Sequence, residues 1–220
     1  ALLVFPISIK TQWNNYLPCD GQIAWAELPA SLDTADFNFS TSFTVEGWLY
    51  FNQADAPVTI LSMRQEDNAL IYRLGKQSGQ RFYFEVTDVH GKTWQAAADD
   101  VVPTGEWVHV AGVLQKNDND VDVLALYVNG SRRGLVREEI DLAPQAIARK
   151  QRALLRVVGE PEDQMFSGRL DEVRISATAR YTEPTISALD NTFPLDAATM
   201  ALWHFDEPFG ASIAADASLR

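Results

Sequence analysis

The chain has 220 residues, of which 46% are hydrophobic and 22% are charged, which is the composition of an ordinary folded domain. Its 30 acidic and 18 basic residues give a formal net charge of −12, which repels phosphates and so excludes DNA and RNA as partners. Cys19 is the only cysteine, which excludes a disulfide within the chain and a cysteine-ligated zinc site.

The first nine residues are apolar but do not predict a membrane anchor. A bilayer span needs about 20 consecutive apolar residues, and Pro6 interrupts this stretch. A first β-strand is the preferred interpretation. Because the sequence begins with Ala1 instead of Met, a position after a processed signal is the alternative. Membrane insertion is not expected in either case.

Short runs rich in β-branched and aromatic residues follow, separated by clusters of Gly, Pro, Asn and Asp, and this pattern predicts successive antiparallel strands. The expected strands cover residues 42–51, 59–63, 69–74, 81–86, 94–98, 107–114, 123–128, 154–158 and 168–175. In the first of them, alternation puts Glu46 and Trp48 on the face opposite Val45. Asn129 and Gly130 predict a two-residue hairpin, because both positions tolerate positive φ.

Four segments resemble the laminin G-like jelly-roll family, which is related to concanavalin A-like lectins, pentraxins and glucanases. These segments are residues 43–48, 103–111, 126–130 and 166–175, and their order and spacing match over about residues 20–180. The resemblance implies an all-β fold in which two antiparallel sheets form a jelly-roll sandwich. Within it we expect Trp48, Phe82 and Trp107 to be core residues, since each ring removes a large apolar area from water.

A fifth segment, residues 201–210, resembles the opening strand of such a domain although it lies near the end of the sequence. We expect residues 1–220 to form a single domain in which 201–220 supply a closing strand, because the termini of sandwiches usually lie close together. The alternative is that 201–220 begins a further module. An alternating strand in this segment would bury Trp203 and Phe205 together.

The resemblance also implies a structural calcium ion held by Asp171, the acidic residue that opens the last core strand. Its partners would be Asp206 or Glu207 in the fifth segment. Calcium takes six to eight oxygen ligands, many of which can be backbone carbonyls, so a few carboxylates suffice. The net negative charge of the chain agrees with a divalent cation as cofactor.

The same strand permits an interpretation without metal. Asp171 and Glu172 lie between Arg169 and Arg174 in the sequence. Exposed salt bridges among these four residues would account for the acidic pair, so both interpretations stay open.

Catalysis is not expected. The glucanases that the chain resembles carry a Glu-x-Asp-x-x-Glu run whose carboxylates act as a pair, and this sequence has no such run. No histidine lies in a Gly-x-Ser-x-Gly motif or beside the cysteine. His109 alternates with Val108 and Val110 in an expected strand, so we expect a hydrogen-bonded structural histidine.

Four aromatic residues outside the framework segments are candidates for stacking on sugar rings. They are Trp13, Tyr16, Trp25 and Trp94. Packing in the core or at its rim is the alternative for each of them, because an exposed tryptophan is costly.

The sequence therefore predicts a non-catalytic binding module, located outside the cell or on its surface, for a glycan or a surface protein. This function rests on an analogy of fold. The alternative is a structural subunit that assembles with itself into a surface or filamentous structure, because unpaired strand edges favour strand addition. A glycoside hydrolase is the third and least favoured function.

Overall fold

The structure is a computed structural model, and it describes residues 2–4, 16–20, 26–27, 37, 39–53, 57–65, 67–78, 81–118, 121–142, 154–157, 166–207 and 213–218. These residues form β-strands and no α-helix. Accordingly, the described part of the chain contains no helix with the length and apolar character that a membrane crossing requires.

Two sheets contain all the strands of the described residues. The eight-stranded sheet has the order β15 (Ile213–Ala215), β1 (Leu2–Val4), β3 (Ala26–Glu27), β12 (Leu154–Val157), β5 (Val58–Arg64), β6 (Leu70–Gln77), β7 (Arg81–Thr87) and β8 (Thr93–Ala97). The seven-stranded sheet has the order β11 (Ser131–Glu138), β10 (Asp122–Val128), β9 (Trp107–Gln115), β4 (Phe43–Phe51), β13 (Ser167–Ser176) and β14 (Thr199–Trp203), and β2 (Leu17–Asp20) pairs with the first half of β13.

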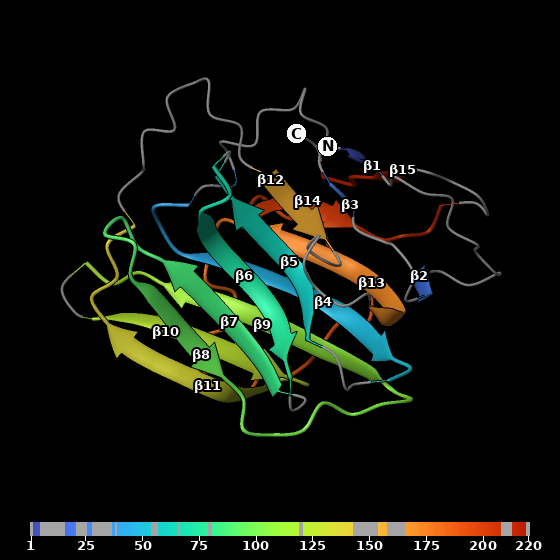
Figure 1. Cartoon of the computed structure of the whole chain (residues 1–220), viewed down its shortest axis with the longest axis horizontal. Coiled ribbons are helices and arrows are strands. Elements are labelled where there is room, and N and C mark those ends of the chain that lie inside the picture. The colour runs from blue at the N-terminus through green and yellow to red at the C-terminus, as the bar shows by residue number, and fades with distance from the viewer. Residues whose placement is uncertain are drawn as a thin grey trace.

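All neighbouring strands are antiparallel, and the two sheets stack face to face (Figure 1). The expectation of an all-β, two-sheet antiparallel jelly-roll sandwich is therefore confirmed. The expected hairpin is present too, since Asn129 and Gly130 have φ values of 46° and 76° and join β10 to β11.

The core lies between the sheets, and strand alternation decides which residues enter it. Phe82 is 1% exposed and is a core residue, as expected. For Trp48 and Trp107 the expectation is wrong, because both are half-buried on the opposite face of the seven-stranded sheet. Their neighbours Leu49 and Val108 face the core, and successive residues of a strand point to opposite faces.

Residues 177–198, which link β13 to β14 and are called the strap below, cross the outer face of the seven-stranded sheet. The apolar residues in contact there are Ala179, Tyr181 and Ile186 from the strap and Ala111, Val113, Ala125 and Tyr127 from β9 and β10. The Tyr127 hydroxyl donates to the carbonyl oxygens of Tyr181 at 3.2 Å and Glu183 at 2.8 Å. The sandwich therefore has a third, partial layer over one sheet.

The C-terminal segment joins both sheets. β14 pairs with β13, and β15 pairs with β1. Trp203 is fully buried and Phe205 is 4% exposed, as expected. Ala201, Trp203 and Phe205 belong to the core cluster whereas Leu202 does not, which agrees with the expected alternation, but the strand is shorter than expected because β14 ends at Trp203 and Phe205 has a positive φ of 54°. Whether residues 201–220 close this domain or begin another stays a prediction.

Candidate ligand-binding face

The outer face of the seven-stranded sheet carries a row of side chains that runs across four strands. Tyr50 in β4 pairs with Trp107 in β9 and with Arg169 in β13. On the far side of β13, Arg169 pairs with Pro18 in β2. Opposed residues of antiparallel strands have Cβ atoms about 4.5–5.5 Å apart on one face. The pairing therefore brings together residues that are distant in the sequence.

Tyr16, immediately before β2, reaches this row and completes an aromatic cluster that consists of Tyr16, Tyr50, Trp107 and Arg169. The Trp107 ring centroid lies 6.0 Å from that of Tyr16 and 5.8 Å from that of Tyr50, with the rings edge to face. The guanidinium carbon of Arg169 lies 4.7 Å from both tyrosine centroids, which is within cation–π range. All four residues are half-buried.

Arg169 differs from Arg174 and Arg73, two other arginines of the sheet faces, in its polar contacts. Arg174 forms an ion pair with Glu46, and Arg73 forms one with Glu85. Arg169 contacts the two tyrosine rings but makes no hydrogen bond or ion pair with any residue that the structure describes. Its N–H groups lie in the guanidinium plane, so stacking on rings leaves them without an acceptor.

The next row of the same face contains His109, Trp48 and Asp171, in register on β9, β4 and β13. The Trp48 ring lies 5.4 Å from the His109 ring, and its Nε1 donates to the carbonyl oxygen of Asp190 at 3.1 Å. Because Asp190 belongs to the strap, the hydrogen bonds of the strap extend as far as this row. The aromatic cluster is the row beyond it.

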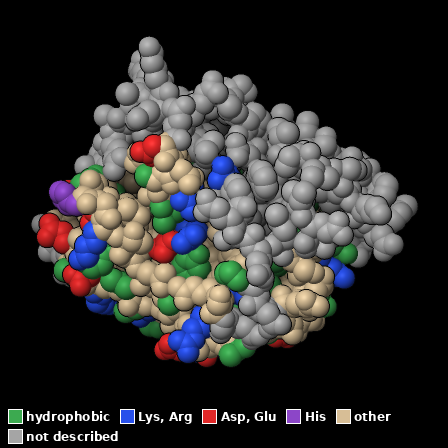
Figure 2. Space-filling model, in the orientation of Figure 1, with side chains coloured by type: hydrophobic (Ala, Val, Ile, Leu, Met, Phe, Trp, Pro, Cys, Tyr) green, Lys and Arg blue, Asp and Glu red, His purple; other side chains and the backbone are tan. Residues whose placement is uncertain are grey.

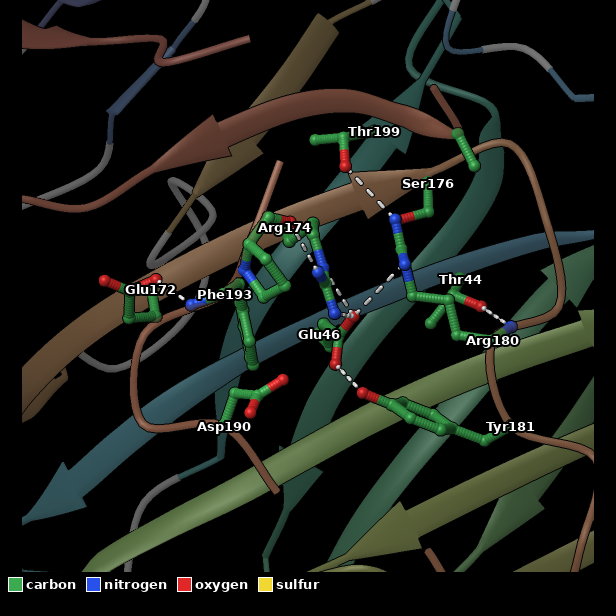
Figure 3. A network of polar contacts seen from close by, with 12 residues as sticks. Thr44, Glu46, Glu172, Arg174, Ser176, Arg180, Tyr181, Asp190, Phe193 and Thr199 are labelled. Atoms are coloured by element: carbon green, nitrogen blue, oxygen red, sulfur yellow. Dashed lines mark hydrogen bonds and ion pairs between the residues drawn. The ribbon is translucent and has the colours of Figure 1, made fainter. Parts of the chain in front are cut away.

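Under the strap, Glu46 is the centre of a buried polar network (Figure 3). Its Oε1 lies 2.9 Å from Nε and 2.8 Å from Nη2 of Arg174. Its Oε2 accepts a hydrogen bond from the Tyr181 hydroxyl at 2.6 Å and lies 3.0 Å from Nε2 of His109. Since Tyr181 belongs to the strap, the strap and the sheet meet at one buried carboxylate.

The groups around Glu46 favour its ionised carboxylate. Burial by itself would raise the pKa of Glu46, but the hydrogen bond from His109 and the positive charge of Arg174 outweigh burial, so the pKa is lowered. An ionised carboxylate only accepts hydrogen bonds, so Nε2 of His109 carries the hydrogen in this contact. The expectation of a hydrogen-bonded structural histidine at position 109 is confirmed.

The salt bridges that the sequence allowed between the acidic pair of β13 and its flanking arginines are not formed among the described residues. Arg174 is paired with Glu46, and Arg169 lies between two tyrosine rings. Glu172 instead accepts a hydrogen bond from the backbone N–H of Phe193 at 2.7 Å. That interpretation of Asp171 and Glu172 is therefore wrong, because β4 and the strap offer closer partners than the neighbours in sequence.

The three residues expected to hold calcium are placed in two groups. Burial, and then the negative charges of Glu172 and Asp206, raise the pKa of Asp171 to about 7. Asp171 and Asp206 therefore lie close enough to repel each other. Glu207 points elsewhere, since its Oε1 accepts a hydrogen bond from the backbone N–H of Ala215 at 2.6 Å.

The donor chemistry of Asp171 and Asp206 fits calcium, because both offer carboxylate oxygens and a cation would offset the repulsion that raises the pKa of Asp171. In the described ranges, no group of three or more His, Cys, Asp or Glu side chains is arranged to hold a metal. Backbone carbonyls and water would have to supply most of the six to eight ligands. The calcium site stays a prediction.

A laminin G-type family model, described as the concanavalin A-like lectin/glucanases superfamily, matches residues 22–187. The chain belongs to this superfamily. The resemblance carried by the four sequence segments is thus confirmed over most of its expected extent. A comparison with curated proteins finds no match.

Solved structures with the superfamily fold are similar to the chain. A heptameric SAP-like pentraxin from Limulus polyphemus has a TM-score of 0.50 and 16% identity, over 82% of this chain and 77% of that one. A candidate carbohydrate binding protein from Bacteroides ovatus has a TM-score of 0.58 and 16% identity, over 98% of this chain and 55% of that one. The IT-sialidase CBM40 of Ruminococcus gnavus has a TM-score of 0.53 and 13% identity, over 81% of this chain and 94% of that one. The chain thus spans about half the length of the Bacteroides ovatus protein, and identities this low show the fold alone.

The four aromatic candidates for ligand contact fall in different places. Tyr16 is part of the aromatic cluster. Trp94 packs against the core with Lys92 Nζ 3.3 Å from its ring centroid and with Nε1 3.3 Å from an Asp88 oxygen. Trp13 and Trp25 lie outside the described residues. Of the two candidates that the structure describes, Tyr16 therefore belongs to the aromatic cluster and Trp94 does not.

Sequence reasoning missed Tyr50, Trp107 and Arg169. A signal for each was present, because strand alternation puts Tyr50 and Trp48 on one face of β4 and puts Trp107 opposite Val108. This alternation was overlooked because large aromatic residues were assumed to enter the core. No sequence pattern paired Arg169 with tyrosines from two other segments.

The outer face of the eight-stranded sheet differs in its polar contacts, and Figure 2 shows charged side chains of both signs among other residues on its described part. Glu85 accepts hydrogen bonds from Nε of Arg73 at 2.7 Å and from Nε2 of Gln95 at 3.1 Å. Gln77 donates to Gln95 at 3.1 Å. These polar groups satisfy one another across β6, β7 and β8, whereas the donors of Arg169 meet no acceptor in the part of the chain that the structure describes.

Proposed function

We propose that this chain is a carbohydrate-binding module whose aromatic cluster holds the sugar. The observation that carries the proposal is that the half-buried rings of Tyr16 and Tyr50 both contact one guanidinium on an outer sheet face and both contact the half-buried ring of Trp107. Aromatic side chains combine a large apolar surface with a polar tip. They suit a sugar, which has apolar C–H faces and hydroxyl edges.

The names of similar structures support a binding role. The Ruminococcus gnavus CBM40 is named as bound to α2,3-sialyllactose, and the Bacteroides ovatus protein is named as a candidate for carbohydrate binding. From these neighbours we infer that the partner is a glycan or a surface protein, and that the module acts outside the cell or on its surface.

The proposed module does not catalyse. Its superfamily also includes glucanases, whose hydrolytic chemistry requires paired carboxylates. The sequence has no Glu-x-Asp-x-x-Glu run. The aromatic cluster consists of three aromatic residues and one cation, so the residues that would touch the sugar carry no acid or base for this reaction.

A structural subunit that assembles with copies of itself is the second candidate. One observation favours it, since the similar Limulus polyphemus pentraxin is named as heptameric. Charged Arg133, Arg137 and Glu138 on β11, which ends the seven-stranded sheet, oppose strand addition there. A monomer that binds a glycan supports the first candidate, and an oligomer that binds none supports the second.

We also propose that a structural calcium ion is held by Asp171 and Asp206. The half-buried position of Asp171 and its repulsion by a neighbouring carboxylate support this proposal. The ion would offset that repulsion and tie β13 to the segment after β14. Glu207 is the weaker candidate ligand because one of its oxygens is already bound to Ala215.

A glycan array followed by calorimetry tests the binding role. Trp107→Ala and Tyr50→Ala should each abolish binding of whichever glycan the wild type retains, because each removes a ring of the aromatic cluster. Trp94→Ala is the matched control, since it also removes a half-buried ring but lies outside the cluster. Absence of any glycan ligand, or binding that survives both cluster variants in folded protein, would contradict the proposal.

A further inference from the structure

We propose that the sugar bound at the aromatic cluster carries a carboxylate, and that Arg169 is the residue that selects it. This inference rests on the proposed function and adds the class of ligand. The carboxylate would occupy the N–H edge of the guanidinium while the apolar face of the sugar contacts the rings.

The first argument is the set of donors that Arg169 leaves free. Guanidinium has five N–H donors and no acceptor. None of the described residues accepts a hydrogen bond from Arg169, while Arg174, Arg73 and Arg180 each meet a carboxylate. A half-buried cation whose N–H donors meet no acceptor among the described residues can bind an anion. A carboxylate matches the edge of the guanidinium, because it accepts two parallel hydrogen bonds.

The second argument is that the cation is held in place. Tyr16 and Tyr50 lie at equal distances of 4.7 Å from the guanidinium carbon, and Tyr50 is also in contact with Trp107. A long arginine side chain normally loses rotamer freedom when it binds. Here the rings restrict that freedom before binding, so more of the interaction with a carboxylate appears as affinity.

The third argument concerns the surrounding charge. Asp171 is the acidic residue of the adjacent row, but its Oδ1 accepts the N–H of Glu172 at 2.9 Å. It does not pair with Arg169 among the described residues. The net charge of −12 disfavours polyanions, whose binding relies on many cations. One guanidinium in an acidic protein therefore fits a single carboxylate on a sugar better than a polysulfated chain.

Matched ligands test this inference directly. Calorimetry would compare a galacturonate trimer with its methyl ester, sialyllactose with lactose, and lactose with sulfated lactose. We expect at least one carboxylate ligand to bind about tenfold or more tightly than its neutral partner, the size of one charge-assisted hydrogen-bonded pair. Equal affinity within both carboxylate pairs, or a preference only for the sulfated sugar, would overturn the inference.

Variants of Arg169 locate the selectivity. Arg169→Gln should lower affinity for the acidic ligand to that for its neutral partner, and Arg169→Lys should keep only part of the difference because it loses the two-point geometry. Arg133→Gln, an exposed arginine on β11, is the control and should change neither affinity. Selectivity that survives in a folded Arg169→Gln protein would overturn the assignment.

The same measurements separate this inference from the proposed function. Binding of neutral glycans that is lost in Trp107→Ala, without any preference for acid, would leave the binding role intact and refute only the carboxylate selectivity. Absence of binding to every sugar, neutral or acidic, would refute both.

Discussion

Two regions of one sheet face, both built on β4, β9 and β13, differ in how their charges are satisfied. Under the strap, the Glu46 carboxylate is fully buried and is bound by Arg174, His109 and Tyr181. Two rows away, the aromatic cluster is half-buried, and Arg169 has no polar partner among the described residues.

The difference shows that the covering segment, and not the strand pattern, decides the role of an outward-facing residue. A carboxylate beneath the strap loses water, so it is stable only when other side chains supply donors. The aromatic cluster lies beyond the row that the strap reaches, so water can serve its donors until a ligand replaces it. The first region is therefore specified for stability, and the second is the one that we propose for binding.

Deletion of residues 201–220 has the largest expected effect, because it removes most of β14, to which the strap leads. Burial of Trp203 and Phe205 contributes several kcal/mol at about 25 cal/mol per Å², a large share of the roughly 5–15 kcal/mol that stabilises a domain. The shortened chain should unfold or aggregate through the exposed edge of β13.

Thermal melts of both chains at two protein concentrations measure this effect. A shortened chain that stays monomeric, with an unchanged melting midpoint, would show that residues 201–220 belong to a further module instead of closing this one.

Glu46→Ala should cost about 3–5 kcal/mol of unfolding free energy, because it leaves Arg174 buried without its carboxylate. Adding Arg174→Met should recover part of that loss, since no unpaired charge remains. Gln95→Ala, at an exposed position of β8, is the control. Urea unfolding measures the free energy of unfolding of the wild type, the two Glu46→Ala proteins and the control. A loss in Glu46→Ala no larger than the loss in the control would contradict the stabilising role of the buried network.

Calcium removal should lower stability through Asp171. An ion that binds only the folded state adds about 2.7 kcal/mol at a hundredfold excess over its Kd. Chelator should therefore lower the melting temperature of the wild type but leave that of Asp171→Asn unchanged, while Glu207→Gln should respond like the wild type. Equal melting temperatures of the wild type with and without chelator would contradict the calcium site at Asp171, which lies in the row between the two regions.

The smallest expected effect is the pH dependence contributed by Asp171 without metal. The pKa of Asp171 is about 7 in the folded state, above the ordinary value of 3.8, so the folded state holds this proton more tightly than the unfolded state. The stabilisation is complete below about pH 4 and is lost as the pH rises through 7. Asp171→Asn cannot ionise and should flatten this part of the profile.

Urea unfolding in chelator from pH 4 to 8 measures that slope. Identical profiles for the wild type and Asp171→Asn would show that the carboxyl of Asp171 is not held in the half-buried, repelled position from which its pKa follows.

Sequence patterns were sufficient for the features that depend on local periodicity. Alternation and turn residues predicted the strands of the sandwich, and Asn129 and Gly130 predicted their hairpin because few residues accept positive φ. The internal position of His109 between two valines likewise predicted a structural role, which its contact with Glu46 confirms.

Patterns failed where an interaction joins segments that are distant in sequence. The expected partners of Asp171 and Glu172 were the arginines beside them, whereas Arg174 pairs with Glu46 across a strand boundary.

By itself, the sequence determined the alternation of side chains along each strand, because the side-chain period of an extended backbone is two residues. Only the tertiary structure decided which outward faces are covered. The strap buries Glu46, while the register of β2, β13, β4 and β9 places Arg169 between Tyr16 and Tyr50 beside Trp107. Register and coverage depend on the free energy of the whole sandwich, and no short stretch of sequence contains that information.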